Sequence, residues 1–135
     1  MVKVLIMKQS KDKISMAKIE FRSTCPVASM LDIVGDKWTL VVVRDLFLNK
    51  HRYNDFLTSP EAIPTNILAD RLKRLESAGM IKREIYQTNP PRAEYFLTTR
   101  GSDLAPILLA MLKWGVQYLP GVKLPKNLVL PSIKD

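Results

Sequence analysis

The side chains best placed to recognise another molecule lie on one face of the segment 64–79. At about 100° per residue, Leu68, Leu72 and Leu75 fall within a narrow apolar sector. The opposite face carries Asn66, Asp70, Lys73 and Ser77, with Ala69 and Arg74 at its edges. An asparagine amide can form two hydrogen bonds with adenine, and a lysine ammonium can donate to guanine. These residue types therefore offer hydrogen bonding to base edges of duplex DNA, without any change in covalent bonds.

Position along this helix predicts which residues lie nearest the bases. In helix-turn-helix proteins the N-terminal half of the second helix enters the major groove. The residues expected nearest the bases are Thr65, Asn66, Ala69, Asp70 and Lys73, and those expected beside the phosphates are Arg71 and Arg74. Asp70 is unfavourable against DNA, and two roles stay open for it: pairing with Arg74 at i+4, or repelling wrong registers.

A two-stranded hairpin is predicted directly after this helix, which ends at Gly79. It consists of strand 80–86, a turn at 87–91 whose two prolines cannot donate to a strand ladder, and return strand 92–97. Arg92 stands beside the turn, where it could enter a minor groove or contact the DNA backbone. A charged helix alone is also compatible with a solvated surface. A charged helix followed directly by a hairpin is compatible with fewer folds than a charged helix alone. This order of elements predicts a winged helix-turn-helix.

Shorter elements upstream are expected to position this helix. One helix should begin at Pro26, whose missing N–H costs nothing in a first turn, and end at Gly35. Asp36 can cap a second helix, 37–48, through its side-chain oxygen. The apolar residues of that segment occupy nearly the whole circumference of the helix, which predicts a central buried helix. A short helix at 52–57 should then complete the helix-turn-helix.

The whole chain predicts a single domain flanked by two less regular ends. Its 135 residues suit one core, and 47% hydrophobic with 25% charged residues is typical of a globular protein. The domain is expected at 23–121, ending in a helix at 102–119 that is capped by Thr98 or Thr99. Residues 1–22 form a basic arm, partly without fixed structure, and 122–135 form a C-terminal tail. No apolar run reaches the ~18 residues of a membrane span, and no signal peptide is recognisable, so a cytoplasmic protein is expected.

The net charge of +8 is compatible with a nucleic-acid partner. Seven basic and four acidic side chains lie in residues 63–100, so part of the excess falls on the segment predicted to contact DNA. A basic protein whose lysines simply solvate it would show the same balance. Charge alone does not separate the two interpretations.

Covalent and metal chemistry have little support in the sequence. Cys25 is the single cysteine, so neither an intrachain disulfide nor a cysteine-based zinc site can form. His51 is the single histidine, and its place between a lysine and an arginine predicts a solvated surface residue. We therefore expect no metal, no cofactor and no enzymatic activity. An enzyme with Cys25 as nucleophile would need an activating base, for which only His51 is available among histidines.

Several short motifs, in order over residues 25–115, resemble the HxlR-type winged-helix transcriptional regulators, relatives of the MarR group. They are Cys25-Pro26-Val27, Gly35-Asp36-Lys37-Trp38, Arg44-Asp45-Leu46, Arg52-Tyr53-Asn54-Asp55-Phe56, Ile63, Leu68 to Glu76, Gly79-Met80-Ile81, Pro90-Pro91-Arg92-Ala93-Glu94-Tyr95, Leu97-Thr98 with Gly101, and Trp114-Gly115. Each motif is weak alone, but the series is specific. Two residues depart from the family pattern. Pro64 stands where a serine commonly caps the helix that contacts the bases, predicted here at 64–79, so Thr65 would have to cap it. Asn49 stands where a glycine is usual.

The resemblance implies a mainly α fold with a small β-hairpin wing, and a homodimer bound to a palindromic operator. The N- and C-terminal helices would build the dimer interface, for which exposed Met111 and Trp114 are suited. A repressor is expected, responsive to a thiol-reactive or small-molecule signal, since some members sense oxidants or quinones through the cysteine that matches Cys25. Arg22 is a candidate cation beside this thiol. A buried or inert Cys25 is an equally open interpretation, and a non-specific architectural nucleic-acid-binding protein is the alternative function.

Overall fold

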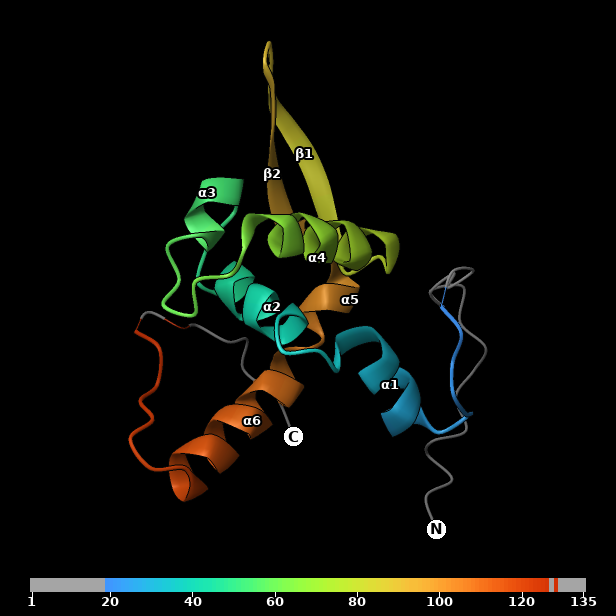
Figure 1. Ribbon diagram of the computed structural model, residues 1–135, viewed down its shortest axis with the longest axis vertical. Helices are drawn as coiled ribbons and strands as arrows, with labels where there is room; N and C mark the ends of the chain where they lie inside the picture. Colours follow the sequence, from blue (N-terminus) through green and yellow to red (C-terminus); the bar gives the residue numbers. More distant parts are fainter. Residues whose placement is uncertain (1–18, 127, 129–135) are drawn as a thin grey trace.

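Six helical segments and one antiparallel hairpin make up the described part of the computed structural model, residues 19–126 and 128 (Figure 1). Their bounds are α1 Pro26–Val34, α2 Thr39–Phe47, α3 Tyr53–Phe56, α4 Thr65–Ser77, β1 Ile81–Thr88, β2 Pro91–Leu97, α5 Thr99–Ser102 and α6 Ala105–Tyr118. The expected mainly α fold with a hairpin wing is confirmed. Most of the predicted N-terminal arm, and the tail apart from residues 122–126 and 128, lie outside the described residues.

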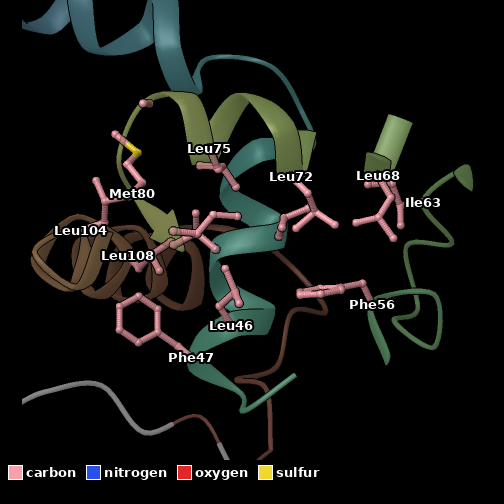
Figure 2. Close-up of a cluster of buried hydrophobic side chains, with 14 of the residues drawn as sticks. Leu46, Phe47, Phe56, Ile63, Leu68, Leu72, Leu75, Met80, Leu104 and Leu108 are labelled. Carbon is pink, nitrogen blue, oxygen red and sulfur yellow. The ribbon is translucent and has the colours of Figure 1, made fainter. Parts of the chain in front are cut away.

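The core forms around α2, as its all-round apolar pattern predicts. Val42, Val43 and Leu46 of α2 are buried against the leucine face of α4, where Leu68, Leu72 and Leu75 are 0–1% exposed. In Figure 2 Leu72 and Leu75 point from α4 toward α2, while Leu108 of α6 lies near Met80 at one end of the cluster. Burial of apolar surface stabilises a fold by about 25 cal/mol per Å². Burial of the leucine face is therefore the main interaction that holds α4 in place.

The start of α2 depends on the Asp36 side chain. Its Oδ2 accepts hydrogen bonds from the backbone N–H groups of Trp38, at 3.0 Å, and Thr39, at 3.2 Å. Asp36 is not the cap residue that the sequence predicts, because these bonds hold residues 37–38 in a turn. The helix begins at Thr39 rather than at residue 37, and Trp38 stands at its cap position, where no side-chain cap forms. At the other end Asn49, which stands where a glycine is usual in the family, has φ 63°, in the left-handed region.

The hairpin is longer than the sequence predicts. Both strands extend into the expected turn, because Thr88 still pairs with Pro91 and only two residues remain between the strands. Pro91 can end a ladder because a terminal position does not require its N–H. The register is interrupted between Ile85 and Gln87, so Tyr86 lies in a bulge. The hairpin therefore projects well beyond α4 (Figure 1).

One expected helix is divided in two. Instead of a continuous helix over 102–119, α5 ends at Ser102 and α6 begins at Ala105. Pro106 lies in the first turn of α6, where its missing N–H is tolerated, but it could not continue a helix from upstream. Thr98 caps α5 by accepting a hydrogen bond from the N–H of Gly101, at 3.2 Å. A Cβ atom at Gly101 would lie 2.0 Å from the carbonyl oxygen of Met80, so only glycine fits this approach.

Candidate nucleic-acid interface

The polar face of α4 is open to solvent. Of the residues predicted to lie nearest the bases or phosphates on this helix, all but Arg71 are exposed: Thr65, Asn66, Ala69, Asp70, Lys73 and Arg74. Because the leucine face is fixed on α2, the position of these side chains is set by the core. Figure 1 shows α4 lying across the base of the wing, so that one side of the molecule carries both elements.

The first turn of α4 is held by a tertiary bond and not by a side-chain cap. Pro64 occupies the cap position, and no side chain accepts a hydrogen bond from the backbone there. Thr65 is the first helical residue, so the expectation that it would take over the cap is wrong. The Tyr53 hydroxyl instead donates a hydrogen bond to the carbonyl oxygen of Thr65, at 2.5 Å. This bond ties α3 to the start of α4.

Arg71 is turned inward toward the loop before α2. Its Nε lies 2.8 Å from Oδ2 of Asp36, and its Nη1 pairs with Asp70. The Asp70 carboxylate thus pairs with Arg71, and the suggested pairing with Arg74 is not found. The Arg71 side chain is only 17% exposed, and its bond to Asp36 raises the pKa of the guanidinium. Arg71 is therefore occupied within the chain, while its neighbours on α4 are open to solvent.

Asp36 joins the start of α2 to the middle of α4. Burial alone would raise the pKa of this carboxyl, but hydrogen bonds from Thr39, Arg71 and the Trp38 backbone outweigh burial and lower the pKa to about 2. The carboxylate therefore stays charged at all ordinary pH values. The sequence did not predict this ion pair, because its two partners are 35 residues apart and share no local pattern.

Lys73 and Arg74 differ from Arg71 in having no ion-pair partner among the described residues. Both are exposed, as is Arg92 beside the tip of the wing. Their charges are available to a ligand without first breaking an internal salt bridge. Three unpaired cations on α4 and the wing form a surface to which an extended anion can bind.

The turn between α3 and α4 is fixed by a buried polar network that was not predicted from the sequence. Asp45 of α2 is 2% exposed, and it accepts hydrogen bonds from Ser59 in that turn and from Arg44. Arg44 also forms two bonds of 2.8 Å with Glu61, and these bonds lower the pKa of the Glu61 carboxyl. The available clue was an aspartate inside an otherwise apolar helix, because a buried carboxylate needs partners.

Two single-residue expectations can be compared with the structure. Cys25 is exposed, and the backbone N–H groups of Ala28 and Val27 at the start of α1 lower the pKa of its thiol. Arg22, the expected cation beside it, is paired with Asp32 at 2.5 Å. His51 is not the predicted solvated residue: it is half-buried, its Nδ1 lies 2.8 Å from the carbonyl oxygen of Tyr95, and its ring stacks on Phe96. The wing supplies both partners, which could not be foreseen from the neighbours of His51 in sequence.

A family model of HxlR-like helix-turn-helix proteins matches residues 33–123. The chain belongs to this family. An uncharacterised HTH-type transcriptional regulator of Synechocystis sp. is 39% identical to this HxlR-type protein over 95 residues, 70% of each chain. The uncharacterised regulator YdeP of Bacillus subtilis is 40% identical over 94 residues, 70% of this chain and 73% of the relative. The solved structure of the redox regulator HypR in its oxidised form is 38% identical, covers 69% of this chain and 96% of that chain, and has a TM-score of 0.63.

These likenesses establish the HxlR-type protein as a transcriptional regulator of the helix-turn-helix class and not an enzyme. They confirm the winged helix-turn-helix fold and the relationship to MarR-type regulators. Within the described part of the chain, no cluster of His, Cys, Asp or Glu is arranged to hold a metal ion. No helix in residues 19–126 is both long enough and apolar enough to cross a membrane.

Proposed function

We propose that this protein is a homodimeric repressor that binds a specific, palindromic sequence of double-stranded DNA. The observation that supports this most directly is the exposed face of α4 beside the wing, held on a rigid core. The donors and acceptors needed to read base edges are present on that face, in Asn66 and Lys73. The repressor role and the operator symmetry rest on the resemblance to the family.

The base contacts are proposed for Thr65, Asn66, Ala69, Asp70 and Lys73. Phosphate contacts are proposed for Arg74 and Arg92, whose charges have no partner among the described residues. Arg71 contributes differently in this proposal: because Asp36 and Asp70 occupy its guanidinium, it orients α4, and only the remaining N–H donors can reach a phosphate. Asp70 is neutralised in part by Arg71, which reduces its repulsion from DNA.

A second copy of the chain is the proposed partner for an unusually apolar surface. On α6, Met111 and Trp114 are 52% and 59% exposed, and on α1 Val27 and Leu31 are 67% and 51% exposed. A monomer rarely leaves large apolar side chains of two helices so open to water. Binding of such a dimer to two half-sites requires the two α4 helices to lie about 34 Å apart, one turn of DNA.

The proposed signal is a thiol-reactive or other small molecule acting at Cys25. The thiol is exposed and its pKa is lowered, the two properties that favour reaction as a thiolate. One solved relative, HypR, is described as a redox regulator. Since the chain has a single cysteine, a disulfide would join two chains or one chain and a small thiol. A cytoplasmic location stays a prediction that follows from action on DNA.

Selection of bound duplexes from a random DNA pool tests this function. The purified protein should enrich a two-fold symmetric motif, with half-sites one helical turn apart. Enrichment of no sequence, together with an affinity that depends only on salt, would instead favour the alternative of a non-specific architectural protein. An enriched motif without symmetry would contradict the homodimer but leave specific binding intact.

A further inference from the structure

We propose that the cleft between α3 and the wing is a seat for the sugar-phosphate backbone of duplex DNA, with Arg52 as its anchor. This inference rests on the proposed function and extends it to a surface away from α4. The cleft has a volume of about 550 Å³, and three arginines line it: Arg52, Arg83 and Arg92. Figure 1 shows α3 beside the wing, at the same side of the molecule as α4.

Arg52 is fixed in place by the wing. Its backbone forms an antiparallel bridge with Glu94 of β2, and its Nε lies 3.4 Å from the Glu94 carboxylate. Its guanidinium carbon lies 4.1 Å from the centre of the Tyr86 ring, in a cation–π contact. Tyr86 is the bulge residue of β1, so the irregularity in the hairpin coincides with the ring that supports Arg52. Stacking orders the guanidinium plane but leaves its Nη donors free.

The charge balance of the cleft favours an anion. Asp55 is the acidic residue that lines it, and Glu94 contacts Arg52 from β2. Both carboxylates already accept hydrogen bonds: Asp55 from the Arg52 backbone N–H at 3.1 Å, and Glu94 from the Arg52 side chain. Arg83 and Arg92 have no ion-pair partner within residues 19–126 and 128, and the Arg52 side chain is 53% exposed. Planar guanidinium groups match phosphate oxygens with paired hydrogen bonds.

The geometry places this seat in register with the reading helix. Tyr53 follows Arg52 directly, and its hydroxyl holds the carbonyl oxygen of Thr65 at the start of α4. A backbone phosphate bound by Arg52 would therefore be fixed, through two adjacent residues, relative to the first turn of α4. Contacts to phosphate carry no sequence information themselves, but they set the position in which bases are read.

The test compares Arg52→Gln, Arg83→Gln and the wild type on the selected operator and on an unrelated duplex, each over a range of salt concentrations. Each neutralised arginine should make the slope of log affinity against log salt shallower by about 1. Affinity should fall roughly threefold to tenfold on both duplexes, because the contact is to backbone. Lys123→Gln, which removes an exposed cation from the segment after α6, is the control and should change neither quantity.

A second arm identifies the contact itself. Uncharged methylphosphonate is substituted for single phosphates flanking the half-site, and the loss of affinity is measured for both proteins. One or two positions should weaken the wild type yet have no further effect on Arg52→Gln. Tyr86→Phe should keep the wild-type slope and Tyr86→Leu should reproduce Arg52→Gln, because only the first retains the ring that supports the guanidinium.

An unchanged salt slope in both arginine variants, or phosphate losses that are the same for the wild type and Arg52→Gln, would overturn the proposal. So would a change in the selected sequence, since it would mean that the cleft reads bases. If the wild type selects no sequence at all, the proposed function fails, yet the slopes on the unrelated duplex still decide the role of the cleft. Arg83→Gln keeps the test valid if Arg52→Gln perturbs the fold, because Arg83 is exposed on the wing.

Discussion

Oδ2 of Asp36 lies 2.8 Å from Nε of Arg71, and this contact joins the loop before α2 to the middle of α4. The same carboxylate oxygen accepts hydrogen bonds from the backbone N–H groups of Trp38 and Thr39 at the start of α2. Two helices are therefore oriented by one side chain. The buried leucine face of α4 fixes the helix on the core, and the ion pair adds a polar contact between α4 and the loop before α2.

Loss of this ion pair should weaken DNA binding without removing any predicted base contact. We expect Asp36→Ala and Arg71→Ala each to lower operator affinity and to cost about 1–3 kcal/mol of unfolding free energy. The double variant should be less harmful than the sum, with a coupling energy above about 0.5 kcal/mol, as for residues in direct contact. Urea unfolding and fluorescence anisotropy measure the two effects. Strictly additive losses would show that the pair is not energetically coupled.

Stability should depend on pH through Asp36. Its pKa is about 2 in the folded protein against an ordinary 3.8, so the charged form is favoured by folding. The contribution is complete above pH 3.8 and is lost as the pH falls through about 2. In the wild type the unfolding free energy should therefore fall between pH 3.8 and about 2. Asp36→Asn should reduce this fall by about 1–2 kcal/mol, a figure lowered for the partial exposure of the carboxylate. Urea unfolding at several pH values measures it, with Glu76→Gln, at an exposed position of α4, as the control.

Lys73 tests most directly whether the exposed face of α4 contacts the bases. Lys73→Ala should reduce operator affinity by about 1–3 kcal/mol and relax the preference at one base position, because a base contact is lost. Repeating the selection with the variant measures both effects. Lys123→Ala should leave the selected motif unchanged. Retention of the full motif and affinity by Lys73→Ala would remove this residue from the reading face.

The apolar surface of α6 predicts a dimer that a single charge should disrupt. Trp114→Glu places a carboxylate where the wild type exposes 59% of an indole side chain, and an unpaired charge in an interface is costly. Sedimentation velocity should show twice the 15.4 kDa chain mass for the wild type and the chain mass for the variant. Thr88→Glu, at the end of β1, should remain dimeric. A wild type that sediments as a monomer at all concentrations would contradict the homodimer.

Leu72 tests the link between α4 and the core. Leu72→Ala should cost about 2–5 kcal/mol of unfolding free energy, a large part of the 5–15 kcal/mol typical of a domain. Glu76→Ala, on the exposed side of the same helix, should change the stability by less than about 0.5 kcal/mol. Both are compared by urea unfolding at one protein concentration. Equal effects would mean that the buried leucine face does not hold the helix.

Periodicity and punctuation explain why so much of the fold could be predicted. The three leucines of α4 recur at helical spacing and Gly79 follows with φ 73°, so the extent of this helix was readable locally. The break before α6 was also readable, since Pro106 is incompatible with a continuous helix, but the apolar pattern on either side obscured it.

Contacts between distant segments account for what could not be predicted. His51 is half-buried only because the wing returns to cover it with Phe96. The orientation of Arg71 likewise depends on Asp36, and that of Arg52 on Tyr86. Residue type and spacing indicated which side chains could bind DNA. Which of them are free to do so depends on tertiary partners, and these are not encoded in any local pattern.

The long wing also exposes a strand edge. One edge of β2 is bridged by Arg52, whereas residues 82–86 of β1 are exposed. An open strand edge can template the addition of a strand from another molecule, and charged side chains oppose this. Lys82 and Arg83 stand on that strand, so we expect the cations of the wing also to oppose aggregation when no DNA is bound. Variants that neutralise the wing would then trade solubility against affinity, and expression yield would register the change before any binding assay.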